Sequence, residues 1–400
     1  MLVARIGSGI IRLLLCFLSA ALLGLNVVSG QGATLSVDSK TIPGLTAKSP
    51  IVSHTIRLSG PIEEGDADKL RVILTRLKAA APPTLDRPLA TIELSSAGGD
   101  VYEGLKIGYL LREYSVASVV RARDLCLSAC ALAFLGGTGS RSGPTFVPSR
   151  SIEIGGQVGF HNFSLNTNSE QIPAAKGGRE GMIVGFSMAR GGASALVRYA
   201  TTMGLDMSFI AGLLGRPPEQ WEYIDVAQTF MSLQVCPIGL ERPRPLPATI
   251  AANICNNATA GFSPASPMQA QQFTPRDGKR HLLEHVQKNI ETFSMKGPLV
   301  AQLRAVLATR DDQLIDAVYN DLRSAGIPLL APLGAMFMVT GYSASAYDLE
   351  CHVSFPRDNP DRFDVILQAP EGTVKLFQSP PPACPGLFLY DRDDMLNPRR

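Results

Sequence analysis

Hydrophobic positions along the first half of the chain follow two spacings. Short apolar runs bounded by Gly, Pro or Ser alternate with segments in which apolar residues recur every third or fourth position. The first pattern is typical of strands and the second of helices. Strands that alternate with helices predict an α/β domain with a largely parallel sheet. The expected strands are 51–58, 89–94, 116–120 and 158–163, and the expected helices are 66–78, 102–114, 126–135, 182–203 and 206–214.

The pattern changes after residue 236. The following segment is rich in proline and has little periodicity, which predicts a linker or an irregular segment tied by disulfides. Helical spacing then returns in three pieces over 279–325, and short strand-like runs fill 333–392. These features divide the chain into a leader (1–30), a linker (31–50), an α/β domain (51–236), a Pro-rich linker (237–278) and a small α+β C-terminal module (279–400).

The leader has the features of a secretory signal. Arg5 and Arg12 are its only charges, an apolar run follows over 13–28, and Val-Ser-Gly precedes Gln31. The apolar run is shorter than the roughly 20 residues that span a bilayer. We therefore expect cleavage near Gln31 and a periplasmic or secreted protein, with a retained membrane anchor as the alternative.

Charge and composition exclude two broad classes. The formal charge of +2 comes from 37 basic and 35 acidic residues, and removal of the two leader arginines leaves 35 of each. A neutral mature chain lacks the broad basic field that nucleic-acid binding needs. Because 45% of the residues are hydrophobic, the chain can also bury a large core and is not a disordered protein.

Export places the six cysteines beyond the leader in an oxidising compartment. Six cysteines allow fifteen connectivities, and sequence-local pairing is the simplest of them. That rule predicts disulfides between Cys236 and Cys255 and between Cys351 and Cys384. For Cys126 and Cys130, packing and a bond that locks the turn between them both remain open.

Three segments of the α/β domain carry candidate chemistry, and each follows a predicted strand. They are a Gly98-Gly99 turn, Ser128 at a helix start, where a helix N-terminus favours negative charge, and His161 at a strand end. Each alone has an ordinary explanation, as a turn, a helix cap or a hydrogen-bonded core histidine. Together they offer a nucleophile, a base and backbone donors for an oxyanion.

The residues around these positions resemble a known family. The stretches IRLSGPIEEGDADKL, IELSSAGGDVYEGLKIGYLLR, CLSACALAFLGG and QVGFHNF are similar to the Clp protease proteolytic subunit and its relatives in the crotonase-like superfamily, above all to secreted bacterial members. The resemblance covers 52–235, under half of the chain. It implies a Clp-protease/crotonase-like ββα superhelix domain, with Ser128 as nucleophile, His161 as base, and the Gly99 and Ala129 N–H groups as the oxyanion hole.

The family's catalytic aspartate has no direct counterpart. Its position falls at Trp221, so the nearest carboxylate, Glu222, is the predicted third residue, with Glu219 and Asp225 close by. Asp206 fits a helix cap better. A dyad without a carboxylate stays open. In a Ser–Lys variant of the same superfamily, the base would be Lys106 or Lys176.

The predicted function is that of an exported serine hydrolase that cleaves peptides or proteins without an ATP-dependent unfoldase, cofactor or metal. Family folds of this kind assemble, so we expect a homo-oligomer. An inactive Clp-protease-like binding or scaffold protein is the first alternative. The second is a zinc peptidase built on the H-x-x-E-H string, with His281 and His285 as ligands, Glu284 as base and Glu350 as distal ligand.

Overall fold

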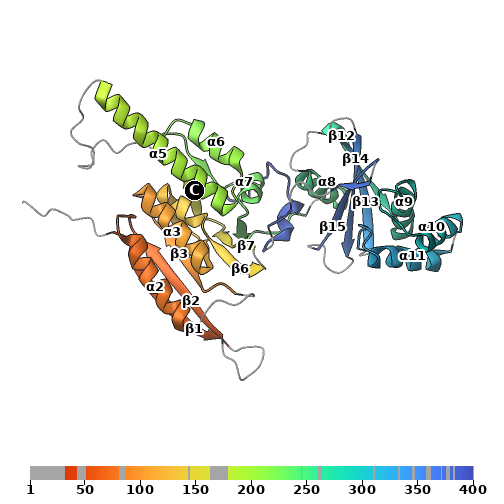
Figure 1. Ribbon diagram of the computed structural model, residues 1–400, viewed down its shortest axis with the longest axis horizontal. Coiled ribbons are helices and arrows are strands. Elements are labelled where there is room, and N and C mark those ends of the chain that lie inside the picture. Colours follow the sequence, from red (N-terminus) through yellow and green to blue (C-terminus); the bar gives the residue numbers. More distant parts are fainter. Residues whose placement is uncertain are drawn as a thin grey trace, which may run out of the picture.

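The computed structural model shows two lobes joined side by side (Figure 1). The first lobe comprises 32–238, and the second comprises 246–374. None of the described helices is long and apolar enough to cross a membrane. The structure describes residues 32–42, 51–80, 87–142, 145–162, 179–244, 246–259, 264–309, 311–331, 334–344, 347–356, 362–370, 372–374, 379–381 and 383–399.

A six-stranded sheet forms the centre of the first lobe. Its order is β1-β2-β3-β4-β8-β11, and all neighbours are parallel except β1 and β2. The central strands β3, β4 and β8 are short and contain no exposed residue, as expected for strands that are covered on both faces of the sheet. The strands are β1 (Thr34–Ile42), β2 (Ile51–Ser59), β3 (Ala90–Ser95), β4 (Val116–Val120), β8 (Arg150–Glu153) and β11 (Cys236–Ile238).

Helices connect and cover this sheet. α2 buries Leu70 and Leu74, and Asp100 caps α3 with a side chain that accepts the N–H of Glu103. Asp206 caps α6 by accepting the N–H of Ser208, as the sequence predicted. The helices are α2 (Asp66–Ala80), α3 (Val101–Tyr114), α4 (Ala129–Phe134), α5 (Arg179–Met203), α6 (Met207–Gly215) and α7 (Ala227–Ser232).

A second, smaller sheet lies beside the first and leads into the candidate site. Its order is β10-β9-β5, with β5 parallel to β9 and β10 antiparallel to it. Between these elements the chain also forms a hairpin of β6 and β7. The strands are β5 (Leu125–Leu127), β9 (Gln157–Phe160), β10 (Glu222–Tyr223), β6 (Thr138–Ser142) and β7 (Thr145–Pro148).

The second lobe is an antiparallel sheet with helices on both faces. α8 packs on one face, where the buried side chains continue the core of the first lobe, and three helices cover the other face with a core of their own (Figure 1). The strands are β12 (Pro264–Phe273), β13 (Gly334–Ala344), β14 (Tyr347–Pro356), β15 (Asp364–Ala369) and β16 (Gly372–Val374). The helices are α8 (Pro247–Ala258), α9 (Pro275–Lys288), α10 (Gly297–Ala308) and α11 (Asp312–Ser324).

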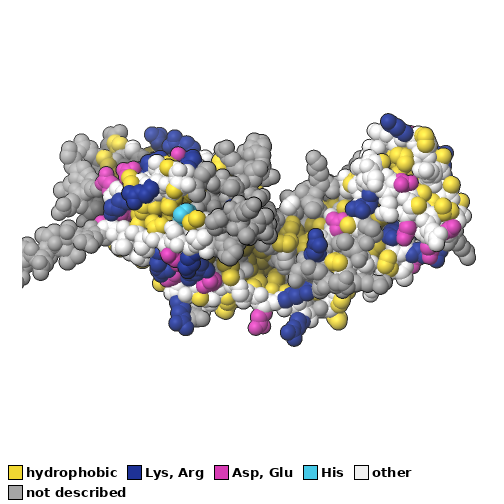
Figure 2. Space-filling model, turned by 90° about the horizontal axis from the view of Figure 1, so that it is seen from below, with side chains coloured by type: hydrophobic (Ala, Val, Ile, Leu, Met, Phe, Trp, Pro, Cys, Tyr) yellow, Lys and Arg dark blue, Asp and Glu magenta, His cyan; other side chains and the backbone are white. Residues whose placement is uncertain are grey.

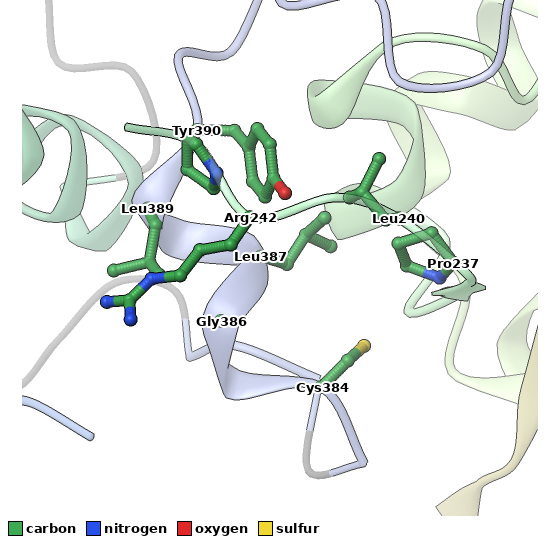
Figure 3. Close-up of a pocket in the computed structure, with 9 residues that line it drawn as sticks. Pro237, Leu240, Arg242, Cys384, Gly386, Leu387, Leu389 and Tyr390 are labelled. Atoms are coloured by element: carbon green, nitrogen blue, oxygen red, sulfur yellow. The ribbon is translucent and has the colours of Figure 1, made fainter. Parts of the chain in front are cut away.

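The C-terminal segment, residues 383–399, returns from the second lobe to the first. It contains the 3₁₀-helix η1 (Pro385–Leu389), and its end lies on the first lobe in Figure 1. The Leu396 and Asn397 N–H groups both donate to the backbone oxygen of Asp225. A hollow of about 230 Å³ lies where this segment meets the residues after β11 (Figure 3). Its lining does not include Ser128 or His161.

The disulfides correct the predicted pairing. Cys236 bonds to Cys384 and Cys255 bonds to Cys351, so each predicted partner was wrong although all four residues form disulfides. The bond between Cys126 and Cys130 is present. The two long bonds join segments that only the tertiary fold brings together: β11 to the C-terminal segment, and α8 to β14.

Several local predictions also differ from the structure. Residues 34–42, predicted as part of a linker, form β1, and the predicted Pro-rich linker contains α8 and β12. The helix predicted over 126–135 begins only at Ala129, because 125–127 pair with β9 as β5. The strand-like run at 386–390 is instead mostly the 3₁₀-helix η1. The predicted cleavage site at residues 28–31 lies outside the described residues.

Candidate active site

Ser128 and His161, which lie far apart in the sequence, meet at the ends of β5 and β9. Ser128 directly follows β5 and His161 directly follows β9. Since these strands run parallel, their carboxyl ends lie at the same edge of the small sheet. Ser128 Oγ and His161 Nε2 are 2.8 Å apart, within hydrogen-bonding distance. A serine hydroxyl at this distance can pass its proton to a neutral imidazole.

The backbone at Ser128 turns sharply. Its φ of 54° and ψ of −120° are unusual for a residue with a side chain, and its N–H donates to the Gly159 oxygen. Strained backbone of this kind persists only where the surroundings hold it, and it is common at active sites. A strand, a strained serine and a helix in succession resemble the strand–turn–helix that carries the nucleophile in α/β-hydrolases.

The disulfide between Cys126 and Cys130 spans this turn. The two cysteines lie two residues before and two residues after Ser128, and both are fully buried. The bond closes a loop whose centre is the serine. We therefore expect it to restrict the backbone around Ser128 rather than to stabilise the whole lobe.

The Gly98-Gly99 turn lies against Ser128. A Cβ added at Gly98 would lie 2.8 Å from Ser128 Cβ and 3.3 Å from the Ala129 nitrogen, so only glycine permits this approach. Gly98 donates its N–H to Ser96 Oγ at 3.1 Å, whereas the N–H groups of Gly99 and Ala129 donate to no partner within the described residues. These two donors are therefore available to a ligand beside Ser128.

Trp221, rather than a carboxylate, contacts the histidine. The His161 and Trp221 rings are 4.3 Å apart between centroids and tilted by 33°. Glu222 forms an ion pair with Arg216, and no carboxylate among the described residues contacts His161. The predicted triad member Glu222 therefore does not reach the histidine. The structure also does not bring the other candidate carboxylates to it: Glu219 is exposed, and Asp225 pairs with Arg399.

The aromatic contact continues to the C-terminal segment. Trp221 stacks on Tyr223 with centroids 6.0 Å apart, and the Arg399 guanidinium lies 4.9 Å from the Tyr223 ring centre. From the sequence, Trp221 is recognisable only as the residue that replaces the expected aspartate. Its role as a ring contact could not be read from the sequence, because β10 pairs with β9 only through the tertiary fold.

A charged network fixes the loop that leads into β5. Arg57 binds Asp124 through two guanidinium nitrogens at 3.0 and 3.1 Å, and Asp124 also accepts the hydroxyl of Ser95. Glu153 accepts the Ala122 N–H, and this hydrogen bond lowers the pKa of the Glu153 carboxyl. The network ties the ends of β2, β3 and β8 to residues 122–124, so it holds the segment that carries Ser128.

The remaining candidates lie elsewhere. Lys106 forms an ion pair with Glu103, and Lys176 lies outside the described residues, so no described lysine reaches Ser128. In the H-x-x-E-H string, His281 Nε2 lies 3.0 Å from Glu350 Oε2, so this histidine and the predicted distal ligand do lie together. His285 instead lies beside Asn289, and the group of side chains close enough together to hold a metal ion consists of His281, Glu350 and His352. The structure therefore does not assemble the predicted zinc-peptidase ligands.

Figure 2 shows one face of the molecule, where hydrophobic side chains and a histidine lie exposed together on the first lobe and are bordered by charged side chains. Leu125 and Trp221, which lie in or beside the small sheet, are among the exposed hydrophobic residues.

Compared with known protein families and with curated proteins, the chain matches none.

Proposed function

We propose that this protein is an exported serine hydrolase that cleaves peptide bonds. Ser128 is the nucleophile and His161 is the general base, and the observation that carries the proposal is the 2.8 Å distance between Oγ and Nε2. A serine is a poor nucleophile unless a base takes its proton, and this geometry supplies that base. The three disulfides support function in an oxidising compartment such as the periplasm.

The reaction would proceed by transfer of the substrate's acyl group to Ser128 and then to water. Ser128 Oγ attacks the substrate carbonyl while its proton moves to His161 Nε2. The Gly99 and Ala129 N–H groups donate to the oxyanion, and the protonated imidazole then gives its proton to the leaving amine. Water, activated by the same imidazole, releases the acyl group from Ser128. These steps use no metal, cofactor or ATP.

The absence of a carboxylate behind His161, among the residues that the structure describes, makes the site a dyad. In Ser-His-Asp enzymes the aspartate orients the imidazole and stabilises its charged form. Here the Trp221 ring fixes the imidazole plane, and its face can attract the imidazolium that forms during the reaction. We therefore propose Trp221 as a positioning residue for His161.

The fold supports the proposed relationship to Clp proteases and the crotonase-like superfamily. A parallel sheet, a small second sheet and a glycine turn beside the serine stand in the order that this family would require. We also propose that the protein self-associates, as members of that family do. Its substrate would be a peptide or protein that it cleaves without an ATP-dependent unfoldase. A binding or scaffold protein with an inactive site is the second candidate, and the missing carboxylate favours it.

A serine-directed fluorophosphonate probe separates these candidates. Wild-type protein should be labelled covalently at Ser128, and Ser128→Ala should abolish labelling. His161→Ala should slow it by several orders of magnitude, because the base that takes the serine proton is then lost. Ser208→Ala, at an exposed serine outside the site, is the matched control and should label like wild type.

Two results would overturn the proposal. Labelling that persists in Ser128→Ala would place the nucleophile elsewhere. A folded wild-type protein that is not labelled would leave the inactive binding protein as the better description. Peptide libraries cut by wild type but not by Ser128→Ala would then identify the substrate class.

A further inference from the structure

Three side chains of types that can bind a metal ion lie together in the second lobe, whereas Ser128 lies in the first. His281 Nε2 lies 3.0 Å from Glu350 Oε2, and His352 Nε2 lies 3.3 Å from the same oxygen. The two imidazole rings are 5.3 Å apart between centroids. One ligand atom from each residue lies within 4.8 Å of the others.

These spacings match the inner coordination shell of zinc. Zinc–nitrogen and zinc–oxygen bonds are about 2.0–2.1 Å long, so tetrahedral ligand atoms lie about 3.3 Å apart. Both distances to Glu350 Oε2 are already close to this value. An ion could therefore bind after only a small movement of the two imidazole rings relative to each other.

Two rigid elements present the ligands. Glu350 and His352 are two residues apart on β14, so they project from the same face of the sheet towards α9, which carries His281. Cys351, between them, projects from the opposite face and is bonded to Cys255 of α8. The disulfide thus attaches β14 to α8 on the opposite face of the sheet, at the residue between the two ligands.

A buried amide lies beside this group. Gln368 is directly opposite Glu350 in the register of β14 and β15, so both side chains project from the same face. Gln368 is only 2% exposed, and neither atom of its side-chain amide has a hydrogen-bond partner among the described residues. Buried polar groups are normally satisfied, so the amide is available to a ligand or to a metal-bound water.

The group is open on one side. The side chains of His281 and Glu350 are 32% and 40% exposed, whereas that of His352 is 2% exposed. Solvent can therefore deliver an ion to a site with a buried ligand at its base and an open coordination position.

We infer that His281, Glu350 and His352 bind a divalent transition-metal ion of the zinc type in the second lobe. Two imidazoles and one carboxylate suit zinc and its neighbours, whereas Mg²⁺ and Ca²⁺ prefer oxygen ligands alone. This site is independent of the proposed hydrolase. It also differs from the H-x-x-E-H reading, because its second histidine comes from the strand and not from position 285.

The test is a zinc titration of the full-length, metal-free protein by calorimetry, with a competing chelator. Wild type should bind one Zn²⁺ per chain and no Mg²⁺. His281→Ala and Glu350→Gln should each weaken binding by more than the roughly 10–100-fold that loss of a partner behind a ligand costs. His285→Ala is the control on the same helix: its ring interacts electrostatically with the three side chains but lies outside the group, so binding should fall far less than in His281→Ala.

Both test variants alter partly exposed side chains, and Glu350→Gln keeps the shape of the residue, so both should fold without metal. Circular dichroism of the metal-free proteins checks this. As a second readout, Zn²⁺ should raise the unfolding temperature of wild type and of His285→Ala but not of His281→Ala. Tetrahedral Co²⁺ absorption bands should follow the same pattern.

Three results would overturn the inference. The first is that wild type binds no zinc, which would make the group an ordinary His–Glu hydrogen-bonded cluster. Binding could persist unchanged in His281→Ala. Binding could also be lost in His285→Ala but kept in Glu350→Gln, which would assign the metal to the helix motif. None of these results depends on labelling of Ser128, so the two proposals fail separately.

Discussion

Two disulfides that close loops of very different length should have separable effects, one on the stability of the fold and the other on the reactivity of Ser128. The Cys255–Cys351 bond joins residues 96 positions apart, and the Cys126–Cys130 bond joins residues only 4 apart. In the chain-entropy model the stabilisation grows with the logarithm of the closed loop, which gives about 4.7 kcal/mol for the long loop and about 2 kcal/mol for the short one. The short loop, however, contains Ser128.

The experiment compares two double variants, Cys255→Ala with Cys351→Ala and Cys126→Ala with Cys130→Ala. Urea unfolding followed by circular dichroism should show the larger loss in the free energy of unfolding for the first pair. Labelling by the serine probe without urea should be slowed in the second pair and unchanged in the first. All four cysteines are buried, so the cavities left by alanine are comparable.

Two outcomes would refute this reasoning. Equal losses in the free energy of unfolding would show that loop length does not set the contribution of these bonds. Unchanged labelling after removal of the Cys126–Cys130 bond would show that the turn keeps its conformation without it.

Three further predictions concern the first lobe. Gly99→Ala would place a Cβ 2.1 Å from a backbone oxygen at a φ of +143°, so labelling of folded protein should fall by about 10²-fold or more, and normal labelling would contradict the proposed oxyanion donor. Trp221→Ala should slow labelling by roughly fivefold, the equivalent of about 1 kcal/mol of cation–π attraction. Trp221→Phe should retain most of the rate, because it keeps an aromatic ring beside His161. Glu153→Gln should destabilise the protein at neutral pH, and urea unfolding across pH should show the difference disappear in acid. The folded-state pKa of Glu153 is lowered, so its stabilisation is present above the ordinary value of 4.5 and is lost as pH falls through the lowered pKa.

The local pattern of the sequence predicts most elements of the first lobe. The helix at 102–114 and the strand at 116–120 bury the apolar residues whose spacing predicted them. The glycine turn, Ser128 and His161 were found because each follows a strand, and parallel strands bring their carboxyl ends together. The sequence pattern is sufficient to predict these site residues, because any residues that directly follow neighbouring parallel strands lie at the same edge of the sheet.

Features that depend on distant contacts could not be predicted. β1 is an edge strand with most side chains exposed, so it lacks the hydrophobic alternation that reveals a strand. β5 is three residues long, too short for its period to be distinguished from the helix that follows. The disulfide partners and the contact between Trp221 and His161 arise only when separate elements pack, and no local spacing encodes them.

The Cys236–Cys384 bond also has a topological consequence for the second lobe. The chain leaves the first lobe after β11 and returns to it through the C-terminal segment, and this bond joins the two crossings, which are 148 positions apart. The second lobe is thus a covalently closed circle attached to the first. A protease that cut this circle once would release nothing: the nicked protein would keep its full mass on a non-reducing gel and separate into two fragments only after reduction.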